Sequence, residues 1–145
     1  MKKILISLLF FTLWGYALYA QNEQEKIKQV VMEAYVSGIH NSGPLENITA
    51  GFHPGFELLG VGSDGNTITK LPIYTWIENI KQSRAAGRVP AVETKYRFLS
   101  IDITGNAAVV KLELLREEKL IFTDYLFLYN FKEGWKIVNK IYHRH

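Results

Sequence analysis

The sequence of 145 residues contains no cysteine. This absence excludes disulfide bonds, zinc sites with thiolate ligands and the attachment of a lipid to a cysteine. The sequence also lacks a Gly-rich phosphate-binding loop, a GxSxG nucleophile elbow and the HExxH motif of zinc enzymes. The fold must therefore be held by a hydrophobic core, which a single domain of this length can supply.

Long runs of charge of one sign are also missing. The chain has 17 basic and 14 acidic residues. Lys2 and Lys3 lie in the N-terminal stretch described next, and without them 15 basic and 14 acidic residues remain. A nearly neutral domain has little electrostatic attraction for nucleic acid or for an anionic membrane surface. We therefore expect no nucleic-acid partner.

Residues 1–20 have the pattern of a secretory signal peptide. Lys2 and Lys3 precede an apolar run from Ile4 to Tyr19, and Ala20 is followed by the polar sequence QNEQEK. A positive start, a short apolar run and a small residue are typical of such a signal. The run is shorter than the roughly 20 residues that cross a bilayer. We expect residues 1–20 to be removed, residues 21–145 to form one domain without a stable membrane span, and the protein to be periplasmic or secreted.

Apolar residues recur at helical spacing in three later segments. The first predicted helix carries Tyr35 on its apolar face and is expected to end at Gly38. The second is a short helix that runs from about Pro44 to Gly51. The third begins near Pro72, because proline is favoured in the first turn of a helix.

The other predicted elements are strands. Helices that are followed by a run of strands are typical of an α+β fold, in which the helices gather on one face of an antiparallel sheet. The predicted strands are two short segments, 57–61 and 67–70, and four longer segments, 94–103, 107–116, 120–131 and 135–142.

The strand at 120–131 is apolar or aromatic on both faces. Tyr125, Phe127 and Tyr129 alternate with Leu126 and Leu128. An antiparallel sheet needs only one buried face. The sheet therefore either curls around a cavity or pairs its outer face with another subunit, and both can hold at once. We predict a homodimer that forms through the outer sheet face.

Three stretches resemble the lumazine-binding branch of the nuclear transport factor 2-like superfamily. They are GIHNSG, FHPGFELLGVGSDG and DYLFLYNFKEGWKIVNKIYH, and the resemblance extends from about Glu25 to Tyr142. It implies a cone-shaped, cystatin-like fold with three helices on the concave face of a curved sheet. The superfamily includes isomerases, dehydratases, polyketide cyclases and non-catalytic binding or adaptor domains, so the fold alone does not decide the function.

Two histidines are candidate site residues. His40 follows the first predicted helix and His53 precedes the first strand, so both could face one cavity. Histidine titrates near neutral pH, and the pair could act as acid and base or bind an anionic ligand. A metal site would need a third ligand such as Glu57 or Asp124. Alternatively, each histidine is structural and bonds a loop carbonyl. We expect no metal and no cofactor.

Asp124 lies inside the most hydrophobic strand. A carboxylate in such a place must be paired, hydrogen-bonded or protonated. Lys140 or Asn139 on the last strand could be its partner. An aspartate with a raised pKa would suit a proton-transferring isomerase. The competing interpretations are a buried ion pair and an outward-facing side chain.

The best interpretation is an exported domain that binds a small, mainly apolar or aromatic molecule in the cone of the sheet. The first alternative is a cofactor-independent isomerase or dehydratase that uses His40, His53 and Asp124. The second is a dimeric interaction module without a functional pocket. A cavity of about 300 Å³ or more would favour a ligand or a substrate. The residues predicted to line the pocket are Tyr35, His40, His53, Trp76, Tyr96, Phe98, Asp124, Lys140 and Tyr142.

Overall fold

The computed structural model describes residues 20–145, so the predicted signal peptide, apart from Ala20, lies outside the described residues. The described chain starts as an α-helix over residues 20–30 and continues as a π-helix, η1 (Val31–His40). Two further helices follow, α2 (Leu45–Gly51) and α3 (Ile73–Ala85). Within residues 20–145, no helix combines the length and the apolar character needed to cross a membrane.

The predicted end of the first helix at Gly38 is wrong, because η1 continues to His40. Gly38 instead allows α2 to approach closely. A Cβ atom on Gly38 would lie only 2.6 Å from Cγ1 of Ile48 in α2. Gly51 has the same role from the other side, since a Cβ atom there would clash with Cβ of Ala34. These glycines therefore mark a tight contact between helices.

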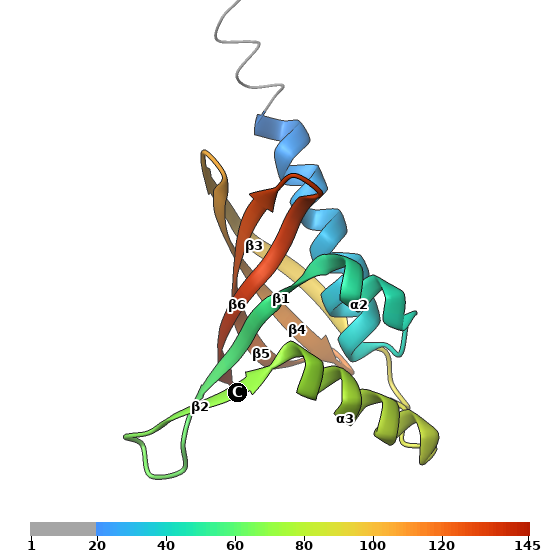
Figure 1. Ribbon diagram of the computed structural model, residues 1–145. Helices are drawn as coiled ribbons and strands as arrows, with labels where there is room; N and C mark the ends of the chain where they lie inside the picture. The colour runs from blue at the N-terminus through green and yellow to red at the C-terminus, as the bar shows by residue number, and fades with distance from the viewer. Residues whose placement is uncertain (1–19) are drawn as a thin grey trace, which may run out of the picture.

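Six strands form one curved sheet in the order β2-β1-β6-β5-β4-β3 (Figure 1). All neighbouring strands are antiparallel except β1 and β6, which are parallel. A parallel pair needs a long connection, and here α3 and four strands separate the two partners along the chain. The strands are β1 (Phe52–Val61), β2 (Ile68–Pro72), β3 (Lys95–Thr104), β4 (Ala107–Arg116), β5 (Lys119–Phe131) and β6 (Gly134–Arg144).

The core lies between the helices and one face of the sheet. Alternate residues of β4 point into it, which is the period-two pattern of a strand with one buried face. On the helical side, Ile27, Val31 and Tyr35 are fully buried. The helix of residues 20–40 thus lies along the inner face of the sheet, as Figure 1 shows. The buried β4 residues are Ala108, Val110, Leu112 and Leu114.

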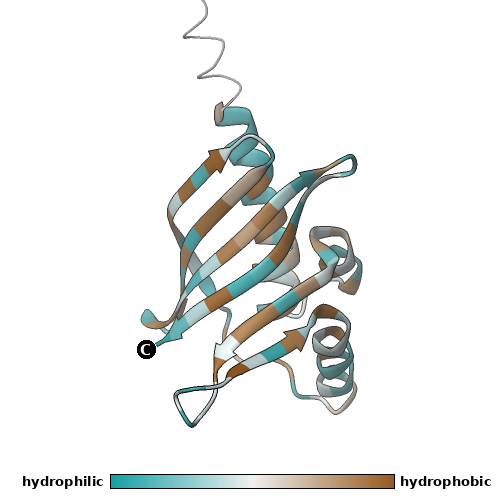
Figure 2. Cartoon of the chain, turned by 60° about the vertical axis from the view of Figure 1, so that its left-hand side comes forward, coloured by the Kyte–Doolittle hydropathy of each residue, from teal (hydrophilic) through white to brown (hydrophobic). Residues whose placement is uncertain are grey.

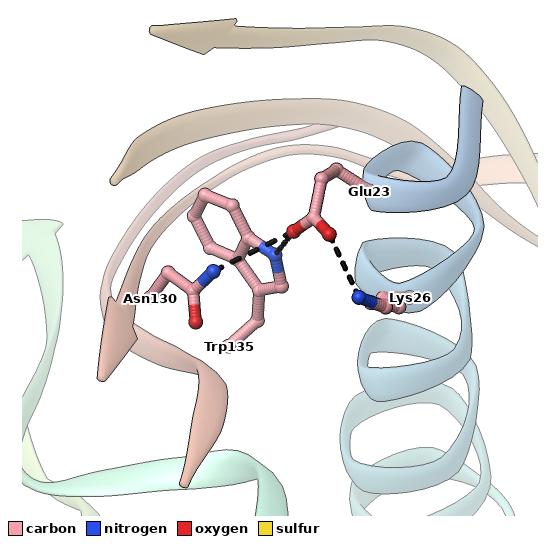
Figure 3. A network of polar contacts seen from close by, with 4 residues as sticks. All are labelled: Glu23, Lys26, Asn130 and Trp135. Atoms are coloured by element: carbon pink, nitrogen blue, oxygen red, sulfur yellow. Dashed lines mark hydrogen bonds and ion pairs between the residues drawn. The ribbon is translucent and has the colours of Figure 1, made fainter. Parts of the chain in front are cut away.

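Glu23 anchors the first turns of the helix to the hairpin of β5 and β6 (Figure 3). Its Oε2 accepts a hydrogen bond from Nε1 of Trp135 at 2.7 Å and a longer one from Nδ2 of Asn130 at 3.5 Å. Its Oε1 forms an ion pair with Nζ of Lys26 at 2.8 Å. The bonds from Lys26 and Trp135 lower the pKa of the Glu23 carboxyl. This cluster orients the helix and is structural.

The outer face of the sheet carries exposed aromatic side chains. Figure 2 shows the sheet in front of the helices, with hydrophobic segments recurring along the strands. Phe127, Tyr129 and Phe131 alternate along β5 and are 39%, 46% and 37% exposed. Ile141 on the neighbouring β6 is 43% exposed. The strand that the sequence showed to be apolar on both faces therefore has one face in the core and one face open to solvent.

Candidate functional site

A pocket of about 220 Å³ lies where the end of η1, the middle of β1, α3 and the ends of β5 and β6 meet. Its wall combines aromatic rings with the side chains of one histidine, one lysine and one arginine. Three of its residues belong to the C-terminal part of β6, where alternate positions share one face of the sheet. The lining residues are His40, Leu58, Trp76, Phe122, Lys140, Tyr142 and Arg144.

A buried polar network stands directly behind this wall. Tyr35 donates a hydrogen bond from its hydroxyl to Oδ2 of Asp124 at 2.6 Å. Nζ of Lys140 lies 2.7 Å from Oδ1 of the same carboxylate. Tyr35 and Asp124 are fully buried and Lys140 is only 4% exposed. The ion pair with Lys140 that the sequence suggested is therefore present, and Asp124 does not point outward.

Burial sets the protonation of this network. Burial, followed by the neighbouring Asp124 charge, raises the pKa of the Tyr35 hydroxyl well above its usual value. Tyr35 is thus a neutral donor. Burial also lowers the pKa of the Lys140 ammonium, and the charge and contact of Asp124 oppose this effect. The close ion pair holds Lys140 in the charged form, because a buried carboxylate stabilises a cation at this distance.

His40 brings into the pocket wall a buried nitrogen without a hydrogen-bond partner among the described residues. Its ring contacts the Tyr35 ring edge-on, with 4.8 Å between the ring centroids. Its Nε2 is buried and has no hydrogen-bond partner within residues 20–145. Burial, and then the positive charges of Lys140 and Arg116, lower the pKa of His40 to about 3. The imidazole is therefore neutral near pH 7, with one donor and one acceptor nitrogen.

The π-helical register and the contacts of Gly38 and Asn41 place His40 in the pocket. Residues five apart in an α-helix point about 140° away from each other, whereas the i→i+5 bonding of a π-helix stacks them. Tyr35 and His40 are five residues apart and their rings touch. Arg84 fastens this end of η1 by donating to the carbonyl oxygen of Gly38 at 2.8 Å. Asn41 binds the backbone N–H and carbonyl of Thr94 at 2.8 and 3.0 Å.

The structure does not bring the two histidines together. Nδ1 of His53 accepts a hydrogen bond from the Gly55 N–H at 3.0 Å, and its ring stacks on Phe131 with centroids 4.7 Å apart. This places His53 beside the end of β5, outside the pocket. Tyr96 and Phe98 contact each other on β3, the edge strand that lies farthest from β1 in the sheet. Neither residue lines the pocket.

Four predicted lining residues do meet at the pocket, namely His40, Trp76, Lys140 and Tyr142. Sequence reasoning missed Leu58, Phe122 and Arg144. Arg144 was missed because the predicted last strand ended at Tyr142, whereas β6 continues to Arg144. A β-bulge in β6 sets which residues of this strand face the pocket. Phe127 of β5 pairs with Asn139 of β6, and the next residue of β5, Leu128, pairs with Ile137. Val138 of β6 is therefore skipped in the pairing. Strict alternation from the buried Trp135 would have turned Lys140 and Arg144 outward, and the bulge turns them inward.

The residues of the site do not form a metal centre. Within residues 20–145, no three histidine, aspartate or glutamate side chains are grouped so that they could hold a metal ion. Glu57, considered as a third ligand, lies 3.5 Å from Nζ of Lys70 in an exposed ion pair. Asp124 has both carboxylate oxygens in contact with Tyr35 and Lys140.

A wider depression of about 650 Å³ lies at the other end of the molecule, beside Glu23, Ile103 and Phe131. The carboxylate of Glu23 is already bonded there by Trp135 and Lys26. The depression offers no buried polar atom without a partner among the described residues. The pocket at His40 is therefore the stronger candidate for a functional site.

Comparisons with known proteins agree with this fold. Residues 22–143 match the model of the family described as "Putative lumazine-binding", and the chain belongs to that family. No curated protein matches the chain. A nuclear transport factor 2-like protein of unknown function from Shewanella baltica is similar, with 25% identity, a TM-score of 0.66, and coverage of 86% of this chain and 94% of that chain.

Two further solved structures share the fold at 14% identity. One is a nuclear transport factor 2-like protein of unknown function from Silicibacter pomeroyi, with a TM-score of 0.68 and coverage of 87% of this chain and 98% of that chain. The other, from Novosphingobium aromaticivorans, is described as having a cystatin-like fold, with a TM-score of 0.67 and coverage of 90% and 87%. The predicted family and the predicted α+β, cystatin-like fold are thus confirmed.

The low pKa of His40 predicts a specific pH dependence of stability. The pKa is about 3 in the folded protein and about 6.5 in an unfolded chain. The unfolded state therefore takes up a proton first as the pH falls, and stability that is present above pH 6.5 is lost toward pH 3. Between pH 6.5 and 4.5, wild type should lose about 2–3 kcal/mol more of its unfolding free energy than His40→Gln.

Urea unfolding at several pH values measures this difference. His143→Gln is the matched control, because His143 is exposed near the end of β6 and should leave the wild-type pH dependence unchanged. Parallel pH profiles for wild type and His40→Gln would contradict the assignment of His40 as a buried neutral imidazole.

Proposed function

We propose that the protein is an exported small-molecule-binding domain and that the pocket at His40 takes a small aromatic molecule. The observation that carries this proposal is the buried Nε2 of His40, which lies in the pocket wall without a partner among residues 20–145. Buried polar atoms are nearly always hydrogen-bonded in folded proteins, so such an atom is a group that a ligand can satisfy. The description of the family and the shared fold support a small-molecule-binding domain.

The size of the pocket restricts the ligand. About 220 Å³ is less than the size of about 300 Å³ or more that would favour a ligand or a substrate, and it lies below the usual range for drug-sized ligands. An apolar cavity of about 150 Å³ is nevertheless large enough to bind benzene. The volume therefore favours a ligand with a single ring and one small substituent.

The walls suit a flat ligand and are largely fixed before it arrives. Trp76 and Phe122 supply aromatic surfaces, and Leu58 supplies an aliphatic one. The Trp76 ring packs against Phe52 and Phe56, with centroids 6.4 and 6.2 Å apart. Aromatic rings in such contacts interact favourably and restrict each other. A preformed wall reduces the entropy that binding must overcome.

The geometry gives less support to the two alternatives. An isomerase or dehydratase would need His40, His53 and Asp124 around one substrate, whereas His53 stacks on Phe131 and Asp124 lies behind Lys140. An interaction module would need no pocket, and it would leave the unpartnered nitrogen of His40 without a purpose. Export is proposed from the composition of residues 1–20.

Filling the pocket should abolish binding. Leu58→Phe adds a ring to the wall, so p-cresol should bind it at least tenfold more weakly than it binds wild type. Val61→Phe is the matched control, because Val61 lies on the same strand, is 77% exposed and is outside the pocket. NMR titration of the amide resonances measures both affinities.

Equal affinity of p-cresol for Leu58→Phe and wild type would place binding elsewhere and contradict the proposal. Native mass spectrometry of the protein purified from its own host complements the titration. It would detect a copurified ligand and, in the same spectrum, show whether the chain starts at residue 21 as export requires.

We also propose that the protein is a homodimer through the outer face of the sheet. The support is the row of exposed aromatic side chains on β5, namely Phe127, Tyr129 and Phe131, next to the exposed Ile141 on β6. Contiguous apolar surface of this kind is typical of a protein–protein interface. Aromatic residues are also enriched at the centres of such interfaces.

A charge within this row should separate the subunits. Wild type is expected to sediment as a dimer, and Phe127→Lys as a monomer, because an unpaired charge would be buried at the interface. Tyr74→Lys is the control, since Tyr74 is 66% exposed on α3 and away from the sheet face. Analytical ultracentrifugation at tens of micromolar makes the comparison, and a monomeric wild type would contradict the dimer.

A further inference from the structure

Positive charge predominates around the pocket. The ammonium of Lys140 and the guanidinium of Arg144 both line it. The positive charges of Lys140 and Arg116 both act on the imidazole of His40. Asp124 is the carboxylate in contact with this group, and its two oxygens are engaged by Tyr35 and Lys140. Within residues 20–145, three positive charges therefore lie at or near the pocket, and one of them, Lys140, is paired with the carboxylate of Asp124.

Lys140 has donors to spare. An ammonium carries three N–H groups, and its oxygen contact within residues 20–145 is Oδ1 of Asp124 at 2.7 Å. Its Nζ otherwise lies over aromatic rings, 4.4 Å from the centroid of Tyr142, 5.3 Å from Tyr35 and 5.7 Å from Phe122. These rings hold the ammonium in place, and they accept no strong hydrogen bond. The remaining donors can serve an oxygen atom inside the pocket.

Arg144 stands at the open side of the same pocket. Its guanidinium lies over the Phe122 ring, with 5.6 Å between the guanidinium carbon and the ring centroid. Stacking on an aromatic face leaves the N–H groups at the edge of the guanidinium free, and their fork geometry matches a carboxylate. No carboxylate of residues 20–145 forms an ion pair with Arg144.

From this arrangement we infer that the ligand is a small aromatic carboxylate, a monoanion whose ring packs against Trp76 and Phe122. Its carboxylate accepts hydrogen bonds from Lys140 and from Nε2 of His40, with the imidazole proton on that nitrogen, and Arg144 closes the site. This inference rests on the proposed function of the pocket and specifies its ligand class.

The physical reason for a charged ligand is the cost of burying a carboxylate. A carboxylate leaves water only where charged or polar donors replace its hydration. A neutral amide of the same shape would satisfy His40, but it would gain nothing from the excess positive charge. Hydrogen bonds between a charged donor and a charged acceptor are also about twice as strong as those between neutral groups.

The test compares benzoate with benzamide, which have nearly the same shape and differ in charge. Isothermal titration calorimetry on the protein spanning residues 21–145 at low salt should give a Kd for benzoate at least tenfold below that for benzamide. Arg144→Gln should weaken benzoate about three- to tenfold and leave benzamide unchanged. Arg144 is exposed, so this variant should fold. Arg97→Gln on β3 is the matched control and should bind both probes as wild type does.

The possible outcomes separate this inference from the proposed function. Equal affinities for benzoate and benzamide, both lost in Leu58→Phe, would overturn the carboxylate assignment while the pocket remains a binding site. Benzoate binding that is unchanged in Arg144→Gln would overturn it as well. If neither probe nor p-cresol binds to wild type, the proposed function itself fails.

Discussion

The ion pair between Asp124 and Lys140 is the interaction on which the rest of this structure depends. Both side chains are almost fully removed from water. Transfer of each charge from water costs several kcal/mol, and it is tolerated only where the two charges meet with good geometry and further hydrogen bonds. The 2.7 Å contact and the hydroxyl of Tyr35 at 2.6 Å meet this requirement. The network therefore joins the first helix to β5 and β6 and fixes the ammonium in the pocket wall.

The same network links the fold to the proposed function. Tyr35 holds Asp124 from η1, and five residues later the π-helix presents His40 to the pocket. Burial, and then the positive charges of Lys140 and Arg116, lower the pKa of His40 and keep it neutral. Asp124 balances only part of this positive charge, so the pocket keeps a surplus that suits an anion. In this view the carboxylate of Asp124 is a positioning group for Lys140. Its direct contacts are with Tyr35 and Lys140, and a role as an acid or a base would require those contacts to be broken.

The sequence predicted the family, the α+β class and the helices, and it named Lys140 as one of two possible partners of Asp124, because each depends on local patterns or on one strong electrostatic rule. The site could be predicted only in part. Which residues face the pocket depends on the β-bulge opposite Phe127 and Leu128, which changes the orientation of Lys140 and Arg144. The end of the first helix depends on packing, since Gly38 accommodates Ile48 of α2. Neither a bulge nor a tertiary contact leaves a periodic signal in the sequence.

A double-mutant cycle between Asp124 and Lys140 tests the central claim most directly. Urea unfolding should show that Asp124→Asn and Lys140→Met each lose about 3–5 kcal/mol, because each leaves a buried charge without its partner. The double variant should lose at least about 1 kcal/mol less than the sum of the two. The exposed pair of Glu78 and Lys81, 2.7 Å apart on α3, is the control. The losses of Glu78→Gln and Lys81→Met should be additive. Additive losses for Asp124 and Lys140 would contradict a structure organised around their ion pair.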